Sequence, residues 1–169
     1  HTHARALTPT HPHTRTHTSQ SCTHSHTPQS TLEKIKQLFS SSTPLPPEKI
    51  APTVGLNIGR LTISGAKLTI WDLGGQASLR AIWESYYAEA QGLVYVVDAA
   101  DSARLDEARG VLGNLLAEPD LANIPLLILA NKQDSLGALP PEEAKQRLAL
   151  PAADSRPMRV LGTSALDGE

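Results

Sequence analysis

The chain has 169 residues, enough for one domain with a buried core, and a formal net charge of −2 at pH 7. That charge balance offers no case for nucleic acid as a partner. The sequence contains no apolar run of about 18 residues, so it predicts no membrane-spanning helix, and it shows no secretory leader pattern. Cys22 is the only cysteine, which excludes an intrachain disulfide.

Residues 1–29 differ in composition from the rest of the chain. They are mostly Thr, His, Ser and Pro, and they hold all seven histidines. Such a segment has too little apolar surface to offset its conformational entropy, so we expect a disordered tail before a domain at 30–169. Two His-x-His pairs raise the alternative of a metal site, but imidazoles on a flexible chain lack preorganised geometry. The alternating His-Thr texture also resembles a translated CA repeat in DNA.

The first element after this tail is predicted to be a helix at 30–40. Ser30 and Glu33 have the spacing of a capping box, which would begin the helix. Leu32, Ile35 and Leu38 then fall on one helical face, which we expect to pack against the rest of the domain.

Hydrophobic period and turn residues divide the remaining chain into alternating strands and helices. In chain order, we expect antiparallel strands at 61–63 and 68–70, a helix at 78–90, a strand at 92–97, a helix at 102–117, a strand at 124–130, a helix from 140 and a strand at 158–161. This alternation predicts an α/β fold with a mostly parallel sheet and one antiparallel edge hairpin.

The strand that ends near residue 73 carries the first candidate site. Asp72 stands at its carboxyl end, where α/β sheets place ligand contacts, and Gly74 and Gly75 let the backbone approach a charged ligand. Gln76 could orient a water for attack on a phosphate. The alternative is a strand that ends in an ordinary Gly-Gly turn.

A second strand end supports the first. The apolar run 124–130 is typical of a parallel strand covered on both faces, and it leads directly into Asn131, Lys132, Gln133 and Asp134. A carboxylate such as Asp134 can accept two hydrogen bonds from guanine, whereas adenine lacks that donor pair. Asn131 can reach the other edge of the base or brace neighbouring loops, and the stem of Lys132 can lie on the ring. Three fixed residues arise by chance about once in 10⁴ positions, so the two strand ends together predict a guanine-nucleotide site.

These motifs, together with residues 52–57, resemble the switch II, base-reading and switch I motifs of Arf and Arf-like small GTPases. Within that family the chain is most similar to the Arf-related branch, on residues 53–59 and 86–98. The resemblance implies an incomplete small-GTPase domain of the P-loop NTPase type, with GTP or GDP and Mg²⁺ as cofactors.

The resemblance also implies a role for each matching residue. Thr53 and Asp72 would hold Mg²⁺, Gly75 would sense the terminal phosphate and Gln76 would position the attacking water. The residues that would bind GTP are Asp72, Leu73, Gly74, Gly75, Gln76, Asn131, Lys132, Gln133, Asp134, Ser164, Ala165 and Leu166. The last three resemble the family's second guanine contact.

One family motif is missing. No Gly-x-x-x-x-Gly-Lys phosphate loop occurs in the chain, and residues 25–29 stand where it is expected. The strand that precedes this loop in the family is central to the family's sheet and also has no counterpart, so we expect a gap between the strands that it should join. The chain further ends before the family's last helix. We therefore expect weak GTP binding and a marginally stable fold.

Two functions follow as alternatives. The first is a GTP-hydrolysing switch in Golgi and vesicle traffic, which the resemblance implies together with a cytoplasmic and Golgi location. Its partners would be an exchange factor, a GTPase-activating protein and effectors at switches I and II, and the Golgi membrane in a full-length form. The second is a nucleotide-free fragment that binds effectors or regulators through residues 79–87.

Overall fold

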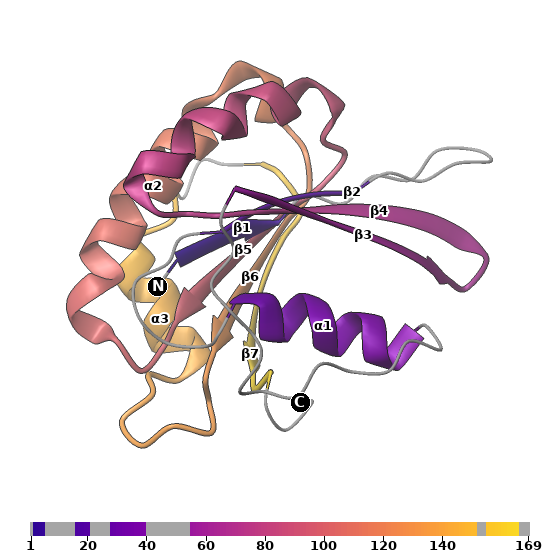
Figure 1. The fold of residues 1–169 in the computed structure, drawn as a ribbon. Coiled ribbons are helices and arrows are strands. Elements are labelled where there is room, and N and C mark those ends of the chain that lie inside the picture. The colour runs from indigo at the N-terminus through magenta and orange to yellow at the C-terminus, as the bar shows by residue number, and fades with distance from the viewer. Residues whose placement is uncertain (1, 6–15, 21–27, 40–54, 152–154, 166–169) are drawn as a thin grey trace.

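A mixed seven-stranded sheet with helices on both faces forms the framework of the protein (Figure 1). The structure, a computed structural model, describes residues 2–5, 16–20, 28–39, 55–151 and 155–165. The strand order across the sheet is β3-β4-β2-β1-β5-β6-β7. The predicted α/β class, a parallel core of β5, β6 and β7 and the antiparallel edge hairpin are confirmed. β1 adds two antiparallel pairings inside the sheet that the sequence did not predict.

From α1 onward the elements follow the predicted order, and several are longer than predicted. The strands are β1 (Thr2–Arg5), β2 (Thr16–Gln20), β3 (Leu56–Ile63), β4 (Ala66–Leu73), β5 (Leu93–Asp98), β6 (Leu126–Asn131) and β7 (Met158–Thr163). The helices are α1 (Pro28–Phe39), α2 (Leu105–Ala117) and α3 (Pro141–Leu148), with the 3₁₀ helices η2 (Ala77–Glu89), η3 (Ser102–Arg104) and η4 (Pro119–Leu121). None of the helices in the described ranges is long and apolar enough to cross a bilayer.

Strands β1 and β2 correct two expectations about the amino-terminal segment. The composition of residues 1–29 predicts disorder throughout, yet Thr2–Arg5 and Thr16–Gln20 are strands of the sheet. β2 pairs in parallel with β4, β1 pairs antiparallel with β5, and the two pair with each other. The expected gap between β4 and β5 is therefore filled. The physical reason is that a central gap would leave backbone N–H and C=O groups of β4 and β5 without partners, and extended backbone of almost any composition can supply them.

Alternate residues of the central strands supply two separate cores, one on each face of the sheet. Tyr95 and Val97 of β5 pack with α2, α3 and η2 in the larger core, together with Ile128 of β6. The residues that alternate with them in β5, Val94 and Val96, face the opposite side. This period-two alternation is the physical basis of a layered α/β fold.

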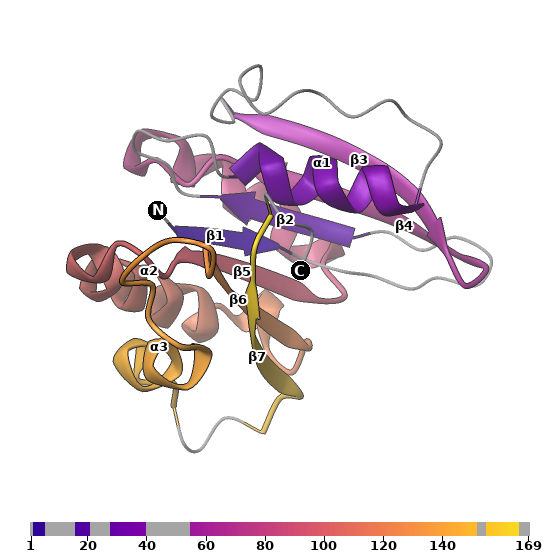
Figure 2. The ribbon, with the colours of Figure 1, turned by 90° about the horizontal axis from the view of Figure 1, so that it is seen from below.

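Helix α1 lies on the face opposite to α2 and α3 (Figure 2). Leu32 is completely buried against Leu61 and Ile70 of the hairpin, as predicted from its place on the apolar face. The predicted capping box is wrong, because the helix begins at Pro28 and Ser30 lies inside it. The predicted burial of Leu38 is also wrong, since this residue, in the last turn of α1, is 61% exposed.

Candidate guanine-nucleotide site

The carboxyl ends of four strands meet along one edge of the sheet. β5, β6 and β7 are parallel to one another. β4 runs in the same direction, because β2 is parallel to β4 and the two antiparallel steps through β1 cancel. Ligands of open α/β sheets bind outside the carboxyl ends of the strands. The predicted site residues at the ends of β4, β6 and β7 therefore share the functional edge.

Asn131 connects three segments at this edge. Its side chain is 2% exposed. Its Oδ1 accepts hydrogen bonds from the backbone N–H of Ala165 and the hydroxyl of Thr163, both at 3.2 Å. Its Nδ2 donates to Oγ1 of Thr31, at 3.5 Å. Of the two roles considered for Asn131, bracing the neighbouring loops is therefore the one that these contacts perform.

Asp134 and Ser164 form the second part of this cluster. The hydroxyl of Ser164, which is buried, donates a hydrogen bond to Oδ1 of Asp134 at 2.7 Å, while the Asp134 residue itself is exposed. A short hydrogen bond to one carboxylate oxygen restricts the rotation of the side chain. Asp134 is thus held at the open edge of the sheet, in an orientation set by a residue 30 positions away.

Lys132 lies in the turn that follows β6 and has a partner the sequence did not suggest. Its backbone is left-handed, with φ of 69°, and its Nζ lies 2.7 Å from Oδ2 of Asp98. Asp98 also accepts a hydrogen bond from the backbone N–H of Ala100 through Oδ1. Asp98 is the last residue of β5, and Asp72 is the second-last residue of β4. This position at a strand end could have identified Asp98 from the sequence as a candidate site residue.

Gln133 supports the loop from inside. Its Nε2 donates to the carbonyl oxygens of Ala130 and Leu139 at 3.1 and 3.0 Å, and its backbone N–H donates to Thr163. Gln133 was predicted as a nucleotide contact, but its side-chain amide donates to backbone carbonyls of the protein.

The end of β4 carries the other predicted cluster. Asp72 has no exposed surface, and Gly74 and Gly75 are buried. Helix η2 holds both glycines through their carbonyl oxygens: Trp83 Nε1 donates to Gly74 at 3.0 Å and Arg80 Nε donates to Gly75 at 2.9 Å. Arg80 was not predicted as a site residue, and its place four residues after Gln76 was the available signal.

The register of the sheet separates this cluster from Asn131. Leu73 is level with Ser19, Ser19 with Ala4, and Ala4 with Tyr95, so β5 continues three residues past the end of β4 to Asp98. At about 3.3 Å per residue this is a step of about 10 Å along the strands. The structure thus brings Asn131, Asp134, Ser164 and Ala165 together and leaves Asp72 to Gln76 as a neighbouring group.

Two predicted site residues, Thr53 and Leu166, lie outside the described residues. For Mg²⁺, which prefers oxygen ligands, the described part of the chain offers the carboxylate of Asp72 at a strand end, and this ligand type fits the ion. The cluster around Asp134 fits the base of a nucleotide, because it presents an oriented carboxylate at the edge of the sheet.

Comparisons with known proteins agree with this geometry. The model of the ADP-ribosylation factor family matches residues 43–169. The chain belongs to the Arf family. The predicted resemblance to Arf and Arf-like small GTPases is confirmed, and the finer resemblance to the Arf-related branch stays a prediction.

Individual relatives of this Arf-family chain are Arf-like proteins. ADP-ribosylation factor-like protein 2 of Arabidopsis thaliana is 47% identical over 71% of this chain and 65% of its own length. ADP-ribosylation factor-like protein 3 of Chlamydomonas reinhardtii is 44% identical over 70% of this chain and 67% of its own length. The chain thus spans about two thirds of these curated relatives. The fold is also similar to the Arl6 BBS3 small GTPase of Trypanosoma brucei with bound nucleotide analogue GppNp, with a TM-score of 0.71 and 26% identity over 82% of this chain and 81% of that one.

Proposed function

We propose that this Arf-family chain carries a guanine-nucleotide switch whose base site is intact and whose phosphate site is weakened. The observation that carries the proposal is the hydrogen-bonded cluster of Asn131, Asp134, Ser164 and Ala165 at the carboxyl edge of the sheet. A carboxylate oriented in this way selects guanine, since other bases leave it without its pair of donors.

The cluster at the end of β4 supplies the reaction in this proposal. Asp72 would hold Mg²⁺ together with Thr53, and the ion would neutralise charge on the terminal phosphates. Gly75 would contact the terminal phosphate, and Gln76 would position the water that attacks it. The Gly75 carbonyl is anchored by Arg80, so η2 responds to any movement of the Gly75 backbone.

The absence of a Gly-x-x-x-x-Gly-Lys loop from the sequence sets the expected affinity. Hydrogen bonds to charged groups contribute about 1.5–3 kcal/mol each, so the loss of four costs about 6–12 kcal/mol, or a factor of about 10⁴ or more. The 169-residue chain should accordingly bind GTP weakly and hydrolyse it slowly. Nucleotide exchange factors, GTPase-activating proteins and effectors at the two switches, and a Golgi membrane for a longer form, complete the proposal by analogy with the family.

The experiment is a titration of the purified chain with fluorescent GDP and GTP in the presence of Mg²⁺. Weak binding that Asp134→Asn reduces at least about tenfold, together with a gain of xanthosine diphosphate binding, supports the proposal, because an amide donates to the xanthine oxygen where guanine has an amino group. Asp120→Asn, which removes an exposed carboxylate from η4, is the matched control and should bind like the original chain. Nanomolar GTP binding would contradict the estimate for the phosphate loop.

A second candidate is an interaction fragment that acts without nucleotide. The observation in its favour is the open cavity beside η2. From the 79–87 segment expected to bind effectors, it is lined by Arg80, Ala81, Trp83, Glu84 and Tyr87. An absence of nucleotide binding in the original chain and in Asp134→Asn alike would favour this candidate.

A further inference from the structure

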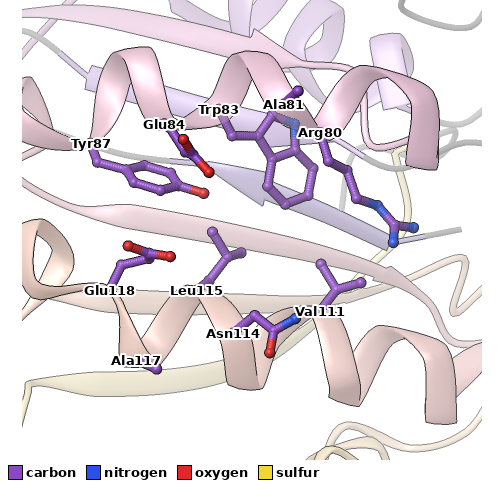
Figure 3. A pocket seen from close by; sticks show the side chains of 10 residues that line it. All are labelled: Arg80, Ala81, Trp83, Glu84, Tyr87, Val111, Asn114, Leu115, Ala117 and Glu118. Carbon is purple, nitrogen blue, oxygen red and sulfur yellow. The ribbon is translucent and has the colours of Figure 1, made fainter.

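A groove of about 470 Å³ lies between helices η2 and α2 (Figure 3). Trp83, Glu84 and Tyr87 line it from η2, and Val111, Asn114 and Leu115 line it from α2. The two helices thus leave a gap that side chains of the described residues do not fill.

One end of the groove is acidic. The carboxylates of Glu84 and Glu118 lie on either side of the Tyr87 ring in Figure 3. Burial raises the pKa of the Tyr87 hydroxyl, and the negative charges of Glu118 and then Glu84 raise it further. The negative charges of both carboxylates therefore reach the Tyr87 hydroxyl, which stays protonated and neutral at physiological pH.

The basic side chain at the groove contacts groups other than Glu84 and Glu118. Arg80 is the only basic residue among the described groove-lining residues. Its Nε donates to the carbonyl of Gly75, and its Nη2 forms an ion pair with Glu107 at 2.6 Å. The acidic end of the groove is therefore left without a compensating cation from the lining residues.

The floor of the groove is apolar. The Trp83 and Leu115 residues are 2% and 3% exposed, and Val111 is half-buried beside them. An aromatic ring face next to carboxylates is a favourable place for an ammonium or guanidinium group, since the ring quadrupole and the acids both attract the cation. An adjoining apolar floor favours a neighbouring aliphatic side chain.

We propose that this groove binds a protein segment that places an arginine or lysine side chain between Glu84 and Glu118 and an aliphatic side chain against Trp83 and Leu115. Charge complementarity selects this occupant: an acidic segment would meet two like charges, and a purely apolar one would bury carboxylates without partners. The proposal names the chemistry of the partner for the second candidate function, on which it rests, because both concern this cavity. Trp83 contacts residues 72–76 through the carbonyl of Gly74, whereas Glu84, Glu118 and Leu115 belong neither to those residues nor to the base cluster.

The experiment is an NMR titration of the full chain with the peptide acetyl-Leu-Arg-amide. We expect shifts of the Trp83 indole N–H and the Asn114 side-chain amide, since both residues line the groove. The variant E84Q/E118Q, which keeps the shape of both side chains, should bind the peptide about fivefold more weakly, as expected for the loss of two partly exposed ion pairs. High salt should weaken binding to the original chain in the same direction.

Two controls make the outcome decisive. Acetyl-Leu-citrulline-amide has nearly the same shape as the arginine peptide without its charge, and it should bind as weakly to the original chain as the arginine peptide binds to E84Q/E118Q. The variant E142Q/E143Q removes two exposed carboxylates from α3 and should leave the affinity unchanged. Equal binding of the two peptides, equal loss in both variants, or no shift at Trp83 and Asn114 would each overturn the proposal. Parallel GDP titrations of the same variants report the proposed nucleotide site separately.

Discussion

Asn131 shows how one buried amide can organise a candidate ligand site. It receives hydrogen bonds from Thr163 and Ala165 and donates one to Thr31, which lies 100 residues earlier. The side chain therefore joins the end of β6 to α1, to the end of β7 and to the segment after it. Buried polar groups of this kind are costly when a partner is removed, because the remaining donors lose both the hydrogen bond and their contact with water.

We expect Asn131→Ala to lower the free energy of unfolding by about 2–4 kcal/mol, since three hydrogen bonds of a buried side chain are lost. Urea unfolding followed by circular dichroism measures the change. Asn114→Ala is the matched control: this residue is exposed in α2, and its replacement should change stability by less than about 0.5 kcal/mol. Similar effects of the two substitutions would show that the Asn131 contacts contribute little.

At the scale of elements, β7 and α3 approach each other closely at one glycine. A Cβ placed on Gly162 would lie 2.8 Å from Cγ of Pro141 and 3.2 Å from Cγ of Gln133. The proline ring is rigid, and Gln133 is held by the carbonyls of Ala130 and Leu139. The packing of α3 against the loop of the candidate base site therefore requires a residue without a side chain at position 162.

Gly162→Ala should accordingly destabilise the protein by about 1–3 kcal/mol, the usual cost of overpacking. Gly113→Ala provides a control of opposite sign. This glycine lies in α2, and a Cβ added to it would meet no atom outside its own helix backbone within 4 Å, so alanine should stabilise the helix by about 0.5–1 kcal/mol. Thermal unfolding of both variants tests the pair, and an equal or more stable Gly162→Ala variant would contradict the steric argument.

Helices η2 and α2 are joined by an ion-pair network around Glu107. Hydrogen bonds from Arg104 and then Arg80 hold the pKa of Glu107 below its ordinary value of 4.5. A carboxyl group whose pKa is lower in the folded state stabilises the protein above its unfolded pKa, and this contribution is lost as the pH falls through the folded pKa. Because Glu107 is 44% exposed, solvent screening keeps the effect small.

We therefore expect Glu107→Gln to cost about 0.5–1 kcal/mol at neutral pH. The difference in unfolding free energy between the original chain and Glu107→Gln should stay constant above about pH 5 and shrink as the pH falls below 4.5, the ordinary pKa of the group. Urea titrations between pH 3 and 7, in about 0.1 M salt, measure it. A difference that stays the same at all these pH values would mean that the network does not affect the titration of Glu107.

At the scale of the whole molecule, β1 and β2 make the sheet continuous. Each pairs with its neighbour in the domain over four residues, β1 with β5 and β2 with β4. Without them, two central strands would each expose an unpaired edge inside the sheet. This arrangement gives the composition-biased amino-terminal segment a structural role that its sequence did not predict.

Removal of residues 1–27 should destabilise the domain on the order of 5 kcal/mol or more, comparable with the total stability of a small domain. Amide hydrogen exchange should then show faster exchange in β4 and β5 than in the original chain. Replacement of the same residues by a Gly-Ser segment of equal length distinguishes strand pairing from chain length, and it should destabilise the domain similarly. Unchanged unfolding in both variants would mean that the segment contributes nothing, as its composition alone suggests.

Local patterns in the sequence determined the fold class, the order of the elements from α1 onward and the position of the candidate base-reading residues. Hydrophobic period and strand-end chemistry are properties of a few adjacent residues, so they can be interpreted without the fold. Only the tertiary structure decided the partners of those residues: Ser164 with Asp134, Asp98 with Lys132 and Thr31 with Asn131. These side-chain pairs depend on which strands are neighbours and on their register. The pairing of β1 and β2 was not predicted for another reason: an unpaired strand edge bonds through its backbone, largely without regard to the side chains of the partner strand.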